Sequence, residues 1–230
     1  MRFSYVTLFE GLIAPYFEDS ILKRAIAKNL LSVDFLNPRD YTTHKHAKVD
    51  DYQASGGAGL VFFPQPLFAL LSELKRQSPQ SYIIFPVPAG KSFKQSDAKR
   101  LATKEHLVFV SGRYEGIDER VIETFADEVF CIGDYVLTGG ELPSLVMSDA
   151  ISRNIKGVLG NEDSLSTESF EETLLEAPCF SKPPLYENKS VPSEFLKGNH
   201  AKILSLKNKM AKSKTQYFRP DLFSRFCVKH

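Results

Sequence analysis

The sequence has no tryptophan, only three cysteines and three methionines, and no long hydrophobic run among its 230 residues. Nothing approaches the roughly 18 consecutive apolar residues that a membrane-spanning helix requires. Residues 1–9 are too short for the core of a signal peptide and lack a cleavage site. Cys131, Cys179 and Cys227 are each about fifty residues from the next and form no C-x-x-C pair. We therefore expect a protein of the reducing cytoplasm.

Several nucleotide-binding and hydrolase motifs are also missing. No G-x-G-x-x-G follows an apolar run, and neither G-x-x-x-x-G-K-[ST] nor G-x-S-x-G occurs. A dinucleotide-binding Rossmann enzyme, a P-loop NTPase and an α/β-hydrolase are therefore disfavoured. His44 and His46 lie near Asp50 and Asp51, but in a segment rich in basic side chains. We interpret them as solvated or phosphate-contacting residues and predict no metal site.

The near-zero net charge of +1 hides a segregated distribution. Residues 196–230 carry nine Lys and Arg and one acid, for +8, whereas residues 1–195 carry an excess of acids, for −7. A basic C-terminal segment on an acidic body indicates a polyanionic partner, although a solvated basic helix face would have the same composition. With 43% hydrophobic residues, the length suits one large domain and one small domain, and excludes a disordered or fibrous chain.

Short apolar runs rich in β-branched and aromatic residues predict buried strands. Amphipathic stretches at residues 19–31, 66–76 and 117–126 alternate with these runs. The alternation is typical of an α/β domain with a parallel sheet, which we place at residues 1–160. The predicted strands are residues 3–9, 60–63, 82–87, 107–111 and 129–132.

The rest of the chain has a different composition. Residues 161–170 are polar, acidic and rich in serine, as is typical of a linker. Four prolines with little periodicity follow, and then residues 198–214, in which apolar residues recur among lysines at helical spacing. We expect residues 171–230 to form a small, mainly helical C-terminal domain.

Three segments that contain glycine or proline each follow a predicted strand, at residues 86–90, 112–116 and 133–140. At the carboxyl edge of a parallel sheet such loops converge and offer backbone N–H and C=O groups to ligands. Three loops in succession favour a small-molecule pocket over three unrelated turns. Glu115, inside the second loop, is placed to face a cationic ligand. The glycine-rich residues 55–59 follow a polar run rather than a strand, which favours a substrate-facing loop over a phosphate cradle.

Four blocks of the sequence are specific enough to identify a family. They are GRYEGIDERV at 112–121, IGDYVLTGGELP at 132–143, SR at 152–153 with GVLG at 157–160, and GNH at 198–200. In these blocks the chain resembles the bacterial tRNA (guanine-N(1)-)-methyltransferases of the TrmD family. The resemblance runs from the first strand to the C-terminal helices, and long ungapped blocks are far more specific than a single short motif.

The resemblance implies a fold of the SPOUT class. A parallel-sheet α/β domain would carry a deep C-terminal trefoil knot, and the small helical domain would follow it. The methyl donor S-adenosylmethionine would sit bent in the knot, at about residues 86–140, where the three converging loops become the knot loops. The family also implies a homodimer with its active site at the subunit interface. Because knots are very rare, composition and periodicity could not have suggested one.

The resemblance also implies which residues bind the donor. Backbone groups of the knot loops would hydrogen-bond the adenine, and Glu115 or the loop carbonyls would favour the positive sulfonium or amino group. The implied donor-binding residues are Pro88, Gly90, Gly112, Tyr114, Glu115, Gly116, Ile132, Gly133, Asp134, Tyr135, Val136, Leu137, Gly139, Gly140 and Pro143.

The family's substrate is the guanine at position 37 of tRNA, just 3′ of the anticodon. Its N1 carries a proton at neutral pH, so methylation needs a base for that proton and a positive group for the charge that moves to O6. Arg153 matches the family arginine for O6. The family base is an aspartate two residues before a phenylalanine; here Glu168, one methylene longer, holds that position, and Asp163 is the second candidate. Mg²⁺ is associated with the family's reaction, but the sequence shows no dedicated metal cage.

Two segments are implied to contact the tRNA. Asp50 and the 55–59 loop align with the family's substrate-side loop, although Ser55 and Ala58 stand where the pattern has glycine and proline. Lysines of the C-terminal domain would supply sequence-independent phosphate contacts, and the guanine would have to leave its stack. The implied RNA-binding residues are Asp50, Gly57, Gly59, Asn199, His200, Lys202 and Lys207, with Lys197, Lys209, Lys212 and Lys214 as further phosphate contacts.

Two other functions stay open at this point. A protein that kept the knotted fold but lost catalytic activity through the aspartate-to-glutamate change would bind RNA without methylating it. A knotted methyltransferase could also act on another RNA site. The intact loops at 112–116 and 132–140 weigh against the first alternative, and only mapping of the modified nucleotide distinguishes the second.

Overall fold

The computed structural model describes residues 1–160, 168–171 and 173–229, which divide into two compact units. The first unit comprises Met1–Gly160, and the second comprises Asn161–His230. No helix in the described part of the chain is long and apolar enough to cross a membrane.

A five-stranded parallel sheet organises the first unit, with the strand order β2-β1-β6-β5-β7. In the centre of the sheet, Phe3 lies opposite Val33 on one side and Leu107 on the other. The predicted α/β class with a parallel sheet is therefore confirmed. The strands are β1 (Arg2–Val6), β2 (Ser32–Leu36), β5 (Tyr82–Ser92), β6 (His106–Val110) and β7 (Glu128–Cys131).

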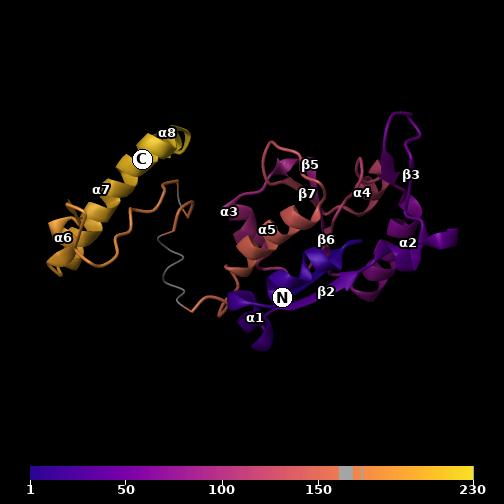
Figure 1. Cartoon of the computed structure of the whole chain (residues 1–230), viewed down its shortest axis with the longest axis horizontal. Helices are drawn as coiled ribbons and strands as arrows, with labels where there is room; N and C mark the ends of the chain where they lie inside the picture. The colour runs from indigo at the N-terminus through magenta and orange to yellow at the C-terminus, as the bar shows by residue number, and fades with distance from the viewer. Residues whose placement is uncertain (161–167, 172, 230) are drawn as a thin grey trace. The chain divides into compact units, whose positions relative to one another are not determined.

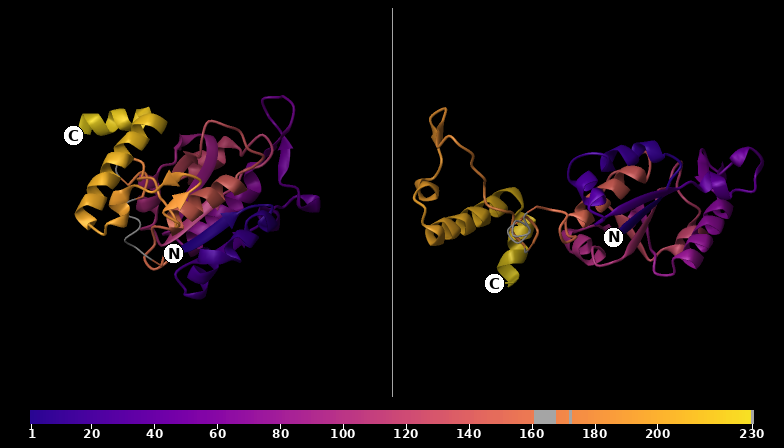
Figure 2. Two further views of the ribbon diagram at one scale, coloured as in Figure 1. Left: turned by 60° about the vertical axis from the view of Figure 1, so that its left-hand side comes forward. Right: turned by 90° about the horizontal axis from the view of Figure 1, so that it is seen from below.

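Helices cover both faces of this sheet, as Figures 1 and 2 show. Phe3 and Tyr5 belong to a core shared with α1, α3 and α5 on one face, whereas Ile83 and Phe85 belong to a core shared with α2 and α4 on the other. Removal of these apolar side chains from water is the main force that stabilises the unit. The helices are α1 (Ser20–Ala27), α2 (Pro64–Gln77), α3 (Gln95–Leu101), α4 (Glu119–Phe125) and α5 (Glu141–Ser152), with short 3-10 turns η1 (Glu10–Leu12), η2 (Ala14–Phe17), η3 (Pro38–Tyr41) and η4 (Lys45–Ala47).

Strand β5 carries a bulge beside β7. Pro86 and Lys91 are both in register with Phe130, so residues 87–90 form the bulge between them. Proline is tolerated there because a bulged segment does not need every ladder hydrogen bond. The prediction that the strand ends at residue 87 is therefore wrong, since pairing with β7 resumes after the bulge.

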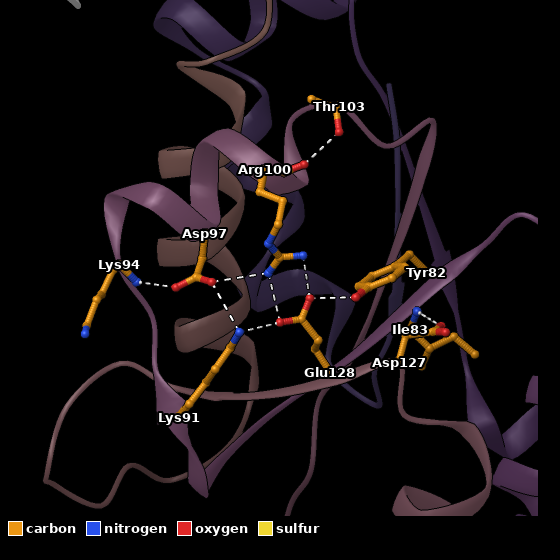
Figure 3. Close-up of polar contacts among 9 residues, drawn as sticks. All are labelled: Tyr82, Ile83, Lys91, Lys94, Asp97, Arg100, Thr103, Asp127 and Glu128. Carbon is orange, nitrogen blue, oxygen red and sulfur yellow. Dashed lines mark hydrogen bonds and ion pairs between the residues drawn. The ribbon is translucent and has the colours of Figure 1, made fainter. Parts of the chain in front are cut away.

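A cluster of ion pairs joins the two ends of this bulged strand (Figure 3). The Glu128 carboxylate accepts a hydrogen bond from the Tyr82 hydroxyl at 2.6 Å and lies 2.7 Å from both Lys91 Nζ and an Arg100 nitrogen. Asp97 pairs with the same two cations at 3.3 and 3.2 Å. Because Tyr82 begins β5 and Lys91 follows its bulge, Glu128 connects the strand on both sides of the distortion.

Replacing Glu128 with glutamine should lower the free energy of unfolding at neutral pH by about 1–3 kcal/mol, because three donors lose a charged acceptor. Burial opposes ionisation of this group, but hydrogen bonds from Arg100, Lys91 and Tyr82 lower the pKa of Glu128 to about 2. Its contribution is therefore complete above the ordinary value of 4.5 and is lost as pH falls towards 2. Urea unfolding of both proteins across this range should show the difference shrinking with acid.

The matched control is Glu73→Gln. Glu73 also forms an ion pair, with Arg76 one turn away on α2, and that pairing likewise lowers the pKa of Glu73 to about 2. The pair lies on the protein surface, where water and salt screen it, so the variant should unfold at nearly the wild-type urea concentration. Equal effects of the two substitutions would contradict a structural role for the Glu128 cluster.

A separate antiparallel hairpin is formed by β3 (Asp50–Tyr52) and β4 (Leu60–Phe62). Two predictions are therefore wrong: residues 60–63 do not join the parallel sheet, and the polar run at 50–53 does contain a strand. The β4 segment is apolar because Phe62 packs into the core beside α2, whereas β3 pairs through its backbone despite poor strand propensity. Strand β2 was not predicted, since it is a short edge strand with a polar Asp34 at its centre.

The second unit is mainly helical within its described residues. Its longest helix, α7, is capped by Asn199, whose side chain accepts a hydrogen bond from the Lys202 N–H at 3.1 Å. Near the other end of α7, the buried Thr215 hydroxyl accepts one from the Leu175 N–H at 2.9 Å and so holds the preceding segment. The elements are β8 (Leu185–Tyr186), β9 (Lys189–Ser190), α6 (Ser193–Leu196), α7 (His200–Phe218) and α8 (Pro220–Lys229).

Candidate active site

The three predicted loops line one cavity of about 220 Å³ where β6 and β7 end and β5 bulges. Of the residues assigned to donor binding from the sequence, those that line it are Pro88, Gly112, Tyr114, Glu115, Gly116, Ile132, Gly133, Tyr135, Val136, Leu137, Gly139, Gly140 and Pro143. The lining also includes Pro86, Val87, Arg113 and Thr138, which lie within the predicted loops, and Phe130 and Cys131, which sequence reasoning missed. Phe130 and Cys131 directly precede Ile132 in the strand predicted at 129–132, so their place at the end of that strand was the available signal.

Backbone hydrogen bonds join the walls of this cavity. The Gly140 N–H donates to the Gly112 carbonyl at 2.9 Å, which ties the loop before α5 to the loop after β6. The loop after β6 is in turn held by the hairpin, because the Glu115 N–H donates to the Leu60 carbonyl at 2.9 Å and the Phe62 N–H to the Gly116 carbonyl at 3.0 Å. The cavity and the hairpin therefore form one connected structure.

Tyr114 links the donor-side loop to the predicted substrate-side loop. Its φ of 59° lies in the left-handed region, a costly conformation for a bulky residue that is concentrated at functional sites. Burial, together with the negative charge of Asp50 and a hydrogen bond to it, raises the pKa of Tyr114. Asp50, which the sequence assigned to tRNA, thus lies in contact with a residue that the sequence assigned to the donor.

Two predicted donor residues do not line the cavity. Gly90 lies on the bulge of β5, where an added Cβ would come within 2.5 Å of the Phe130 backbone. The missing side chain of Gly90 allows β5 to approach the β7 backbone closely at the bulge. Asp134 is exposed in the loop after β7.

The lining suits a flat, partly apolar ligand that carries positive charge. Proline, isoleucine, valine and leucine side chains supply apolar walls, and the glycine-rich segments leave backbone groups accessible between them. Glu115 is the carboxylate of this lining. These features fit the adenine and the cationic groups of S-adenosylmethionine, and Pro88, Gly112, Glu115 and Gly140 are among the residues that would hold it.

Comparison with known proteins identifies the family to which this site belongs. A sequence model described as tRNA (Guanine-1)-methyltransferase TrmD matches residues 1–225. The chain belongs to the TrmD family. Proteins named tRNA (guanine-N(1)-)-methyltransferase from Sulfurimonas denitrificans and Campylobacter curvus are 65% and 60% identical to it. These matches cover 96% of both chains in the first case, and 98% of this chain and 95% of its relative in the second.

The two catalytic candidates, Arg153 and Glu168, belong to different units. Arg153 is half-buried at the C-terminal end of α5, where its N–H donates to the Asp149 carbonyl at 3.2 Å. Glu168 is half-buried in the second unit and lines a cavity of about 610 Å³ together with Glu171 and Lys207. Asp163 lies outside the described residues. The roles of these side chains stay predictions.

The residues predicted to contact tRNA are distributed over the hairpin and α7. Gly57 and Gly59 lie between β3 and β4 with φ values of 117° and 102°. The Asn199 side chain accepts a hydrogen bond from the Lys202 N–H and so caps α7. The other candidates are Asp50 on β3 and His200, Lys202 and Lys207 on α7.

Proposed function

We propose that this chain transfers a methyl group from S-adenosylmethionine to N1 of the guanine at position 37 of tRNA. The observation that carries the proposal is the cavity formed by all three glycine- and proline-containing loops, in a chain that matches the TrmD family over residues 1–225. Relatives at 58–65% identity carry the name of this activity. As an enzyme that acts on tRNA, the protein would work in the cytoplasm.

The reaction needs one group to accept a proton and another to stabilise charge. S-adenosylmethionine, when bound, supplies an electrophilic methyl group on a positive sulfur. Glu168 accepts the proton from guanine N1, so that the ring nitrogen has a free electron pair for the new N–C bond. Arg153 donates a hydrogen bond to O6, where negative charge collects as that proton leaves. The Glu115 carboxylate in the cavity wall stabilises the positive charge of the bound S-adenosylmethionine.

We also propose that the chain works as a homodimer with a trefoil knot in residues 86–140, as the family implies. An apolar surface on η1, η2 and α5 supports the dimer, since Leu12, Tyr16, Leu142 and Val146 are large apolar side chains that are exposed in the single chain. Tyr16 hydrogen-bonds to Asp149 of α5, which places η2 next to that helix. A second copy would cover these side chains.

The tRNA would be held by two regions. Asp50, Gly57 and Gly59 would approach the anticodon loop from the hairpin, and Asn199, His200, Lys202 and Lys207 would approach the backbone from α7. Lysines supply phosphate contacts that do not depend on sequence. Among the described residues, no three His, Cys, Asp or Glu side chains gather as a metal site.

Methyl transfer to two tRNA transcripts tests this function. One transcript carries guanine at position 37, and its control carries adenine there and is otherwise identical. We expect incorporation of about one methyl group per guanine-37 transcript and none above background for the control, because adenine N1 carries no proton and adenine has no O6. Tight binding of tRNA without incorporation would instead identify a non-catalytic RNA-binding protein. Equal incorporation into both transcripts would place the reaction at another nucleotide.

A further inference from the structure

Arg113 lies between two walls of the candidate donor cavity and contacts both. It belongs to the loop after β6, and its guanidinium reaches the opposite loop and the first residue of α5. Its Nε donates a hydrogen bond to Glu141 Oε1 at 3.1 Å, and its Nη2 lies 3.0 Å from Glu141 Oε2. Its Nη1 donates to the Thr138 carbonyl at 3.3 Å. One side chain therefore joins the loops at 112–116 and 132–140.

This ion pair is buried, which makes each partner dependent on the other. The exposed fraction is 17% for the Arg113 side chain and 3% for that of Glu141. Glu141 Oε1 also accepts a hydrogen bond from the Thr7 hydroxyl at 2.8 Å, whereas Oε2 has no hydrogen-bond partner within the described part of the chain. The positive charge of Arg113 compensates for the desolvation of Glu141 Oε2.

The surroundings of the guanidinium leave it little freedom. The Phe9 ring centroid lies 4.5 Å from Arg113 Cζ, a cation–π contact on one side of the planar group. The backbone at Gly139 passes so close that an added Cβ would lie 2.6 Å from Arg113 Nε. Arg113 is therefore confined between the Phe9 ring and the backbone at Gly139.

Few other contacts among the described residues hold the loop after β7. Tyr135 and Val136 are 56% and 85% exposed, so little apolar burial fixes the loop after β7. Its end is attached by the Gly140 N–H to the Gly112 carbonyl and by the contacts of Arg113. Without the guanidinium, the loop at 132–140 would adopt many conformations. Ligand binding would then carry the entropic cost of ordering this loop.

We propose that Arg113 is a positioning residue for the methyl donor, which fixes the loop at 132–140 so that the cavity is formed before the donor binds. This inference rests on the proposed function, because it takes S-adenosylmethionine as the occupant of the cavity. Lysine cannot replace arginine here, since a single ammonium group cannot reach two carboxylate oxygens and a carbonyl in a planar arrangement.

Calorimetry with S-adenosylmethionine on the full chain tests the proposal. Arg113→Lys should raise the donor Kd about tenfold, while the KM for tRNA and kcat at saturating donor stay within about threefold. In the protein without donor, amide hydrogens of residues 132–140 should exchange faster than in the wild type. The control is Arg120→Lys, whose ion pair with Asp118 has an arginine side chain that is 71% exposed. Its donor Kd and its exchange rates should match the wild type.

Unchanged donor Kd and unchanged exchange in Arg113→Lys would overturn the proposal. If that variant fails to fold, Phe9→Leu removes the cation–π contact from an exposed ring and should raise the donor Kd about threefold; no increase would likewise overturn it. Wild-type protein that does not bind S-adenosylmethionine would overturn the proposed function instead. Hydrogen exchange without donor would then still decide whether Arg113 orders the loop.

Discussion

Replacing Glu168 with alanine is expected to lower kcat for methyl transfer roughly 10²- to 10⁴-fold, the range by which a positioned general base accelerates a reaction. Without the carboxylate, the proton on guanine N1 has no acceptor and the ring nitrogen has no free electron pair. The donor Kd should stay close to that of the wild type, because residues of the first unit form the donor cavity, whereas Glu168 belongs to the second unit. Single-turnover kinetics on tRNA and calorimetry with S-adenosylmethionine measure the two quantities separately.

The control for this variant is Glu171→Ala. Glu171 lines the same cavity of the second unit as Glu168 and carries the same charge, so a general loss of negative charge would affect both variants. We expect kcat of Glu171→Ala to stay within about threefold of the wild type. A large loss in Asp163→Ala with normal turnover in Glu168→Ala would show that the base was assigned to the wrong linker residue.

Replacing Gly90 with alanine is expected to destabilise the first unit by about 3 kcal/mol and to weaken donor binding. The new Cβ would lie 2.5 Å from the backbone of Phe130, so β5 or β7 must move. Phe130 is fully buried, and its backbone pairs with Pro86 and Lys91 on both sides of the bulge. The cavity lining at Pro86 and Pro88 would therefore move as well. Thermal unfolding should show a Tm lower by roughly 6–12 °C.

Gly160→Ala is the matched control for that substitution. Gly160 lies at the end of the first unit, is exposed, and has no atom of a described residue within 4 Å of the position that a Cβ would take. The Tm of this variant should stay within about 2 °C of the wild type. Wild-type stability of Gly90→Ala would show that β5 and β7 are not held at the spacing described here.

The sequence predicted the parallel sheet because its inner strands are continuous apolar runs separated by amphipathic helices. The prediction from sequence failed at segments whose burial does not indicate which strand they pair with. Phe62 is apolar because it packs beside α2, although its strand pairs only within a hairpin. Asp34 gives β2 a polar centre because its carboxylate accepts hydrogen bonds from Arg2 at the edge of the sheet. Local sequence patterns indicate which residues are buried, whereas the pairing partner of a strand depends on the tertiary structure.

The candidate cavity was predicted in outline because loops at the carboxyl ends of parallel strands converge. The contacts that shape it were not predicted. Arg113 and Glu141 are 28 residues apart, and nothing in their local sequence pairs them. The contact between Tyr114 and Asp50 likewise follows from docking of the hairpin on the loop after β6. The sequence indicated the residue types and the loop positions of the cavity. The side chains that contact one another there depend on the tertiary structure.

The chemical identity and position of the product test the proposed activity most directly. Unmodified tRNA with guanine at position 37 is incubated with the chain and isotopically labelled S-adenosylmethionine, and the RNA is then digested and analysed by mass spectrometry. We expect one labelled nucleoside, 1-methylguanosine, in the fragment that contains position 37. Label on another nitrogen of guanine, label in another fragment, or no label in RNA that the chain binds would contradict the proposed activity.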